Sequence, residues 1–127
     1  MPPRRRTDPE QGRAALRAAL EAVDAGGAPE RAVLAAAVRF TLEELAVRHP
    51  GGSVEVRVPP FAAVQVVQGP RHTRGTPPAV VETDPLTWLQ LAAGRLAFED
   101  ARAGGRVRAS GERADLGELL PVTAPGT

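Results

Sequence analysis

The stretch TDPLTWLQLAAGRLAFEDARAGGRVRASGERADLGELL, residues 83–120, carries the clearest fold signals in the chain. Asp84 followed by Pro85 is typical of a helix start, because aspartate caps free backbone N–H groups and proline suits the first helical position. Apolar residues then recur at helical spacing as far as Gly94. We therefore expect a helix that begins at Pro85 and ends at this glycine.

The rest of this stretch adds three short elements. Residues 97–103 predict another helix, which the glycine pair after it ends. Residues 106–110 alternate between apolar and polar positions, as a half-buried strand does. Asp115 is placed to cap a last turn of helix that runs to Leu120. Immediately upstream, residues 79–83 predict one more strand.

The N-terminal half predicts two amphipathic helices and two strands. Asp8 and Pro9 open the first helix, which a glycine pair ends, and the second runs from Glu30 to a Pro-Gly-Gly stop. In the second helix, Glu44 and Arg48 are one turn apart and are expected to pair on its solvated side. Two strands are expected to follow, over residues 53–58 and 61–67.

This order of elements predicts an α+β fold. We expect two layers, with a mostly antiparallel sheet of about four to five strands covered by helices. Residues 8–121 would form a single domain. Residues 1–7, which include the run Arg4-Arg5-Arg6, read as a disordered tail, and residues 122–127 as a second tail.

Composition argues against several classes of function. The sixteen basic residues are all arginine, interspersed with acids to a net charge of +1, and no basic stripe with aromatics indicates nucleic-acid binding. The chain has no cysteine, which excludes disulfides and thiol chemistry. No apolar run approaches the ~20 residues of a membrane span, and no secretory signal is evident. We therefore expect a cytoplasmic protein.

The residues give no support to catalysis. The chain has two histidines, His49 and His72, and two serines, Ser53 and Ser110, and none of the four stands in a spacing typical of a catalytic triad or a metal site. The glycine pairs match no phosphate-binding loop. We expect a protein that is not an enzyme and that needs no metal or cofactor.

Residues 83–120 resemble the closing unit of sterol carrier proteins. One pattern is aromatic-Leu-x-Leu-x-x-Gly-basic-Leu, represented here by Trp88, Leu89, Leu91, Gly94, Arg95 and Leu96. The next is Gly-basic-apolar-x-apolar-x-Gly, represented by Gly105, Arg106, Val107, Ala109 and Gly111. The chain is most similar to the bacterial sterol carrier orthologue group of actinobacteria. A related unit ends the mycothiol-dependent maleylpyruvate isomerases. The chain departs from the family in predicting fewer strands than its usual five.

The resemblance implies non-catalytic binding or transfer of a hydrophobic ligand, a fatty acyl or sterol-like lipid, in an apolar cavity between sheet and helices. The candidate lining residues are Phe40, Val64, Val66, Trp88, Leu91 and Phe98. Each of them could equally be ordinary core. An empty cavity of about 300 Å³ would cost up to about 7 kcal/mol at ~24 cal/mol per Å³. Such a cavity must therefore be collapsed, wet or filled.

Two further expectations concern partners. Arg71 and Arg74 belong to a polar loop, residues 68–78, which could cover a pocket mouth and contact an anionic lipid group. The alternative function is an accessory module without a small ligand, in which a helix face binds a partner protein. Stabilisation by ligand would favour the first function, and a co-purifying protein the second.

Overall fold

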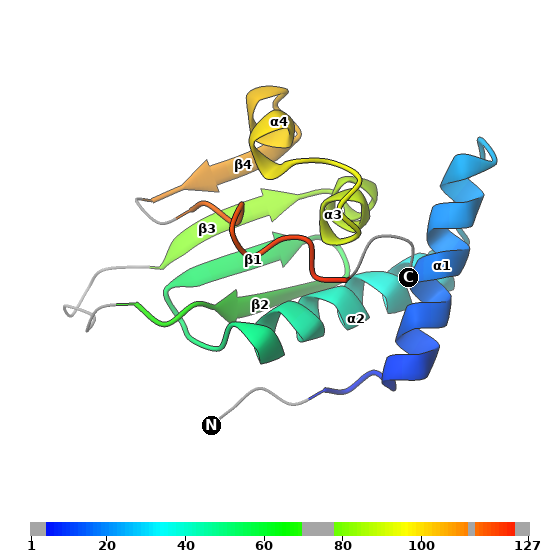
Figure 1. Cartoon of the computed structure of the whole chain (residues 1–127), viewed down its shortest axis with the longest axis horizontal. Helices are drawn as coiled ribbons and strands as arrows, with labels where there is room; N and C mark the ends of the chain where they lie inside the picture. Colours follow the sequence, from blue (N-terminus) through cyan, green and yellow to red (C-terminus); the bar gives the residue numbers. More distant parts are fainter. Residues whose placement is uncertain (1–4, 70–77, 112–113, 124–127) are drawn as a thin grey trace.

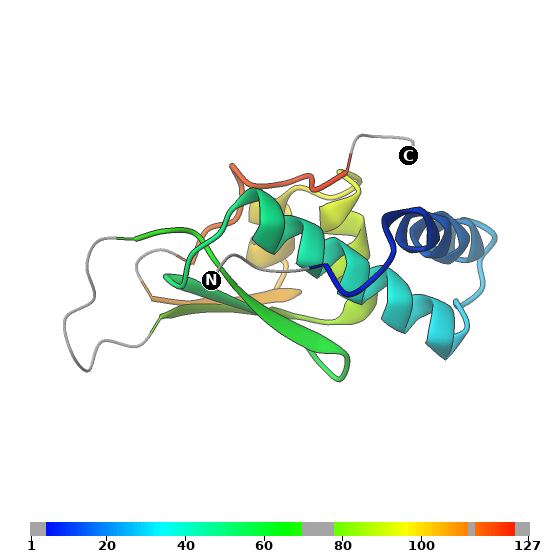
Figure 2. The same cartoon turned by 90° about the horizontal axis from the view of Figure 1, so that it is seen from below.

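The computed structural model describes residues 5–69, 78–111 and 114–123. Within these ranges the chain forms four helices and one sheet of four strands, in the order α1, α2, β1, β2, β3, α3, α4, β4. All four helices lie on one side of the sheet (Figures 1 and 2), which confirms the predicted two-layer α+β fold.

The two N-terminal helices pack against each other, and α2 covers β2. α1 spans Pro9–Asp24, and the Asp8 carboxylate accepts a hydrogen bond from the N–H of Gln11, as expected for its cap. α2 spans Arg31–Arg48 and is buried on nearly every side, because α1, α3 and the sheet surround it. Since α2 contacts all three, it is the central helix of the helical layer.

The two later helices follow the local signals of the sequence closely. α3 spans Pro85–Ala92, and the Asp84 side chain accepts hydrogen bonds from both the N–H and the hydroxyl of Thr87. α4 spans Phe98–Ala103. The loop between them returns the chain toward the far edge of the sheet, where β4 begins.

The sheet has the order β2-β1-β3-β4. The strands are β1 (Val54–Val58), β2 (Ala62–Val66), β3 (Ala79–Thr83) and β4 (Val107–Ser110). β1 pairs with β2 antiparallel and with β3 parallel, and β3 pairs with β4 antiparallel. The sheet is therefore mostly antiparallel, as predicted, with one parallel pairing at its centre.

The N-terminal segment makes contacts with α2 that the sequence did not indicate. The N–H groups of Arg6 and Thr7 and the Thr7 hydroxyl all donate to the Glu43 carboxylate, and Arg5 pairs with Glu44. Residues 5–7 thus lie against α2, and the expectation of a tail through residue 7 is wrong for this part. Two acids on the facing turn of α2 supply the acceptors that a free tail would lack.

The predicted site of Glu44 is also wrong. Glu44 does pair with Arg48, at 3.7 Å, but its side chain is buried and not on a solvated face. The segment of residues 5–7 covers it, and helical periodicity within α2 carries no information about that distant segment.

The C-terminal segment differs from the prediction in two ways. Residues 117–119 form a turn instead of a helix through Leu120, and Asp115 accepts only the N–H of Gly117. Val122 and Thr123 are buried and their N–H groups donate to the carbonyl of Ala92, so the domain extends past residue 121. Leu116 and Val122 are fully buried. Burial of these two side chains fixes an irregular path that local propensity does not reveal.

Candidate functional site

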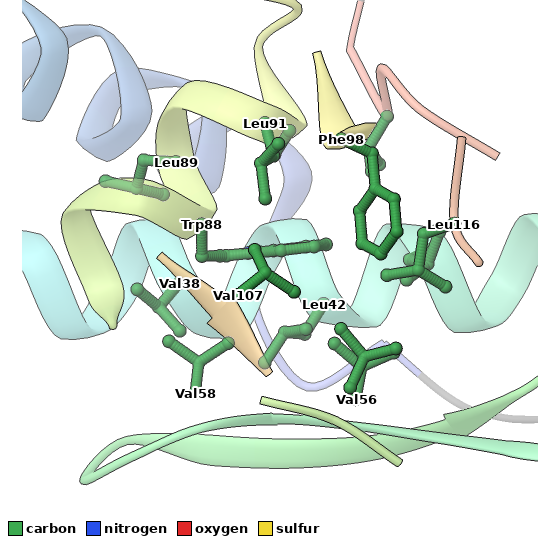
Figure 3. Close-up of a cluster of buried hydrophobic side chains, with 14 of the residues drawn as sticks. Val38, Leu42, Val56, Val58, Trp88, Leu89, Leu91, Phe98, Val107 and Leu116 are labelled. Atoms are coloured by element: carbon green, nitrogen blue, oxygen red, sulfur yellow. The ribbon is translucent and has the colours of Figure 1, made fainter. Parts of the chain in front are cut away.

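The apolar layer between the sheet and the helices is the candidate site. The inner face of β1 presents Val54, Val56 and Val58, and all three are fully buried. Figure 3 shows Trp88 lying across the layer, with α2 side chains and the β1 valines on its sheet side. The layer is therefore built from valine, leucine and a few aromatic side chains, contributed by every major element.

Trp88 is the centre of this layer. Its indole Nε1 donates a hydrogen bond to the hydroxyl of Thr41 at 2.8 Å, and that hydroxyl donates in turn to the carbonyl of Ala37 at 2.8 Å. Both side chains are fully buried. Across the described residues, no buried side-chain nitrogen or oxygen lacks a hydrogen-bond partner. The layer thus offers a ligand apolar contact and few free polar groups.

Four of the six predicted lining residues meet in this layer. Val66, Trp88, Leu91 and Phe98 belong to one core cluster, and each is at most 5% exposed. A side chain that lined an empty ligand-sized cavity would keep surface that water could touch. These four side chains are therefore packed within the core, and the layer is closed around them.

Phe40 lies elsewhere. It is buried but stands outside the main core cluster, at the contact between α1 and α2. A Cβ added to Gly12 of α1 would overlap the Phe40 ring and come within 2.7 Å of its Cβ. Phe40 thus fills the helix–helix interface, and the glycine is what lets the two helices approach there.

Val64 marks the edge of the layer. It pairs in register with the buried Val56 but is only partly buried, because β2 is an edge strand of the described sheet. Phe61, just before β2, is also partly buried, and the Arg31 guanidinium lies 5.2 Å from its ring centroid. The side of the layer between α2 and β2 is therefore a border at which apolar side chains stay partly exposed.

Several residues of the layer were not singled out from the sequence as site candidates. In the sequence, Thr41 is one more position of the apolar stripe of α2, and only the fold brings its hydroxyl to Trp88. The further buried residues drawn around Trp88 in Figure 3 are Val38, Leu42, Val56, Val58, Leu89, Val107 and Leu116. Apolar periodicity predicted that most of them would be buried, but periodicity does not say which of them meet.

Arg71 and Arg74, the predicted pocket-mouth residues, lie outside the described residues, as does His72. Of the other polar candidates, His49 forms the C-cap of α2 and Ser53 donates to the carbonyl of Val67. Among the described residues no three His, Asp or Glu side chains gather as metal ligands. In the same part of the chain, no helix combines the length and hydropathy that crossing a bilayer requires.

Comparison with known proteins agrees with this architecture. Residues 30–122 match the family described as "Bacterial SCP ortholog", and this segment includes α2, the whole described sheet, α3 and α4. None of the curated proteins matches the chain. The relation to mycothiol-dependent maleylpyruvate isomerases stays a prediction. Since the match covers well over half of the sequence, the chain belongs to the family of bacterial sterol carrier protein orthologues.

Proposed function

We propose that this protein binds a long-chain hydrophobic ligand, fatty acyl or sterol-like, in the layer between its helices and sheet, and performs no covalent chemistry on it. The observation that carries the proposal is family membership together with a predominantly apolar layer at the place where the family resemblance puts a ligand. Since the layer is closed, the ligand must open it.

The energy of opening sets a lower limit on ligand size. Making room for a ligand of about 300 Å³ costs up to about 7 kcal/mol at ~24 cal/mol per Å³. Each buried methylene returns about 0.8 kcal/mol. A chain of roughly nine methylenes is therefore needed before binding becomes favourable. Short-chain acids bury too few methylenes to offset the cost of opening the layer, whereas long-chain acids bury enough.

The border between α2 and β2 is the favoured route of entry. Opening there separates partly buried side chains, such as Val64 and Phe61, before it disturbs fully buried ones. Opening beside α3, in contrast, would separate the fully buried Trp88 and Leu89, and Trp88 is also hydrogen-bonded to Thr41 of α2. We therefore place the ligand's first contacts on the inner face of β2.

A pair of neighbouring substitutions on β2 tests this placement. Val64→Trp places a tryptophan on the inner face, and Ala63→Trp places one on the exposed outer face. We expect the first variant to bind palmitate or a fluorescent long-chain acid at least about tenfold more weakly, because the indole occupies the entry. The second should bind as the wild type does. Equal affinity in both variants would place the ligand elsewhere, and no binding by the wild type would refute the function itself.

The same experiment distinguishes lipid binding from the alternative function, an accessory module that binds a partner protein. If the wild type binds no lipid but a protein co-purifies with it from cell extract in fixed ratio, the accessory role replaces the lipid-binding one. If lipid binds and only Val64→Trp reduces it, the accessory role is unnecessary.

A further inference from the structure

The outer face of the sheet, opposite the ligand layer, is not covered by any described helix (Figure 2). Over β3 and β4 this face is hollowed into a groove of about 350 Å³, here called the polar groove, lined by Pro59, Glu82, Thr83, Asp84, Gly105, Arg106 and Arg108. A second concavity of about 300 Å³ shares Glu82 and Arg108 with it and continues along the strands. The groove is open to solvent, and its volume lies at the lower end of the range for small-molecule sites.

Four ionisable side chains line the polar groove, two of each sign. Glu82 and Arg108 face each other in register across β3 and β4. Asp84 directly follows β3, and Arg106 directly precedes β4. None of the four belongs to an ion pair among the described residues, whereas Arg57, on the same outer face, pairs with Glu55. Glu82 and Arg108 therefore keep charge that a ligand can contact, while Asp84 and Arg106 are already engaged in hydrogen bonds within the protein.

Two of these groups are held in place. Arg106 donates through Nε to the Thr87 hydroxyl at 3.2 Å and through Nη2 to Gln90 at 3.3 Å, and the Thr87 hydroxyl donates to Asp84 at 2.6 Å. Partial burial opposes ionisation of Asp84, but the hydrogen bonds from Thr87 and the nearby Arg106 outweigh it and hold the pKa of this carboxyl below its usual range. This anchoring uses Nε and Nη2, and none of the described residues accepts a hydrogen bond from Nη1.

We propose that the polar groove binds a small zwitterion that carries an ammonium group and a phosphate or carboxylate group. The lining charges sum to zero, so an ion of either sign alone gains from one pair and is repelled by the other. A zwitterion can satisfy both pairs, with its anion at the arginines and its ammonium at the acids. This chemistry fits a free amino-acid-like metabolite and an ethanolamine phospholipid headgroup equally.

Titrations followed by ¹H–¹⁵N NMR test the proposal on the full chain. The probes are glycerophosphoethanolamine and glycine as zwitterions, and inorganic phosphate and ethylamine as single ions. We expect at least one zwitterion to cause saturable shifts at Glu82, Asp84, Arg106 and Arg108, with a dissociation constant of about a millimolar. Phosphate or ethylamine alone should cause much smaller shifts there. No saturable shift with either zwitterion, or equal shifts with a single ion, would overturn the proposal.

Charge reversal provides the matched controls. Arg108→Glu should weaken zwitterion binding about tenfold or more, and Arg13→Glu, which makes the same change at an exposed site on α1, should not. The double variant Glu82→Arg with Arg108→Glu restores the balance of charges and should recover binding. If Arg108→Glu binds the zwitterion as tightly as the wild type, and the double variant shows no recovery, the charges of the groove do not form the binding site.

Vesicles distinguish the two sources of the zwitterion. Co-sedimentation with phosphatidylethanolamine–phosphatidylcholine vesicles that Arg108→Glu abolishes identifies a membrane headgroup. Binding of the free probe without co-sedimentation identifies a soluble metabolite. The groove lies on the opposite face of the sheet from the apolar layer, so either result is independent of the hydrophobic ligand.

Discussion

Replacing Thr41 by valine tests the buried hydrogen bond between Trp88 and Thr41 at the centre of the ligand layer. The substitution keeps the shape of the side chain but removes the oxygen that accepts the indole N–H of Trp88. Both residues are fully buried, so water cannot take over the hydrogen bond without opening the layer. A buried donor left without a partner costs about 1–3 kcal/mol. The hydroxyl's own donation to the carbonyl of Ala37 is lost as well, but a carbonyl inside a helix keeps its backbone partner.

We therefore expect Thr41→Val to lower the free energy of unfolding by about 2 kcal/mol. For a domain of this size that corresponds to a fall of about 8 °C in Tm. Trp88 is the only tryptophan in the chain, so its fluorescence reports unfolding by urea or heat without a label. The emission of the folded variant should also change, since the indole loses its acceptor.

Thr123→Val is the matched control. Thr123 is also buried, but its hydroxyl makes only a long contact of 3.4 Å with the carbonyl of Ala92. We expect a loss below about 0.5 kcal/mol there. If Thr41→Val proved as stable as the wild type, the hydrogen bond between Trp88 and Thr41 would not contribute to holding α3 against α2.

Three further changes probe other parts of the structure. Gly12→Ala should destabilise the fold by at least about 2 kcal/mol in urea unfolding, because the new Cβ overlaps Phe40, and adding Phe40→Leu should recover part of this loss. Gly27→Ala is the control and should be nearly neutral, because its new Cβ meets nothing closer than 3.6 Å. Equal losses at both glycines would contradict the contact between α1 and α2 at Gly12. Asp84→Ala should lower the free energy of unfolding by about 1 kcal/mol at pH 7. Because the folded-state pKa of Asp84 is lowered, this loss of stability should persist above the unfolded-state pKa of about 3.9 and disappear as the pH falls through the folded-state pKa. A loss that did not depend on pH would refute the role of the charge. Glu43→Ala should free residues 5–7 from α2, seen as faster hydrogen exchange at the N–H groups of Arg6 and Thr7, and unchanged protection would show that other contacts hold the segment.

Local signals in the sequence predicted the elements well. Asp8 and Asp84 cap helices where expected, and β3 spans the residues predicted for it, because caps, prolines and alternation depend on nearest neighbours. The α+β class followed from the order of these elements. Family membership was also predicted from a local pattern, since the motif around Trp88 and Gly94 lies in one continuous stretch.

Contacts between distant segments were not predictable in the same way. The contact of residues 5–7 with α2 joins residues 36 to 39 positions apart, and the burial of Glu44 depends on it. Phe40 shows the same limit: helical spacing correctly predicts that it is buried, but Gly12, far away in sequence, decides that it faces α1. The polar groove depends on the register of β3 and β4, which places Glu82 opposite Arg108.

The dependence of binding on acyl chain length tests the central claim most directly. Calorimetric titration of the wild type with saturated fatty acids from octanoate to palmitate compares the cost of opening the layer with the gain from filling it. We predict no measurable binding for octanoate, and above roughly ten carbons an affinity that rises about fourfold with each added methylene until the layer is full. Affinity that does not vary with chain length, or no binding even of palmitate, would contradict a ligand site between the helices and the sheet.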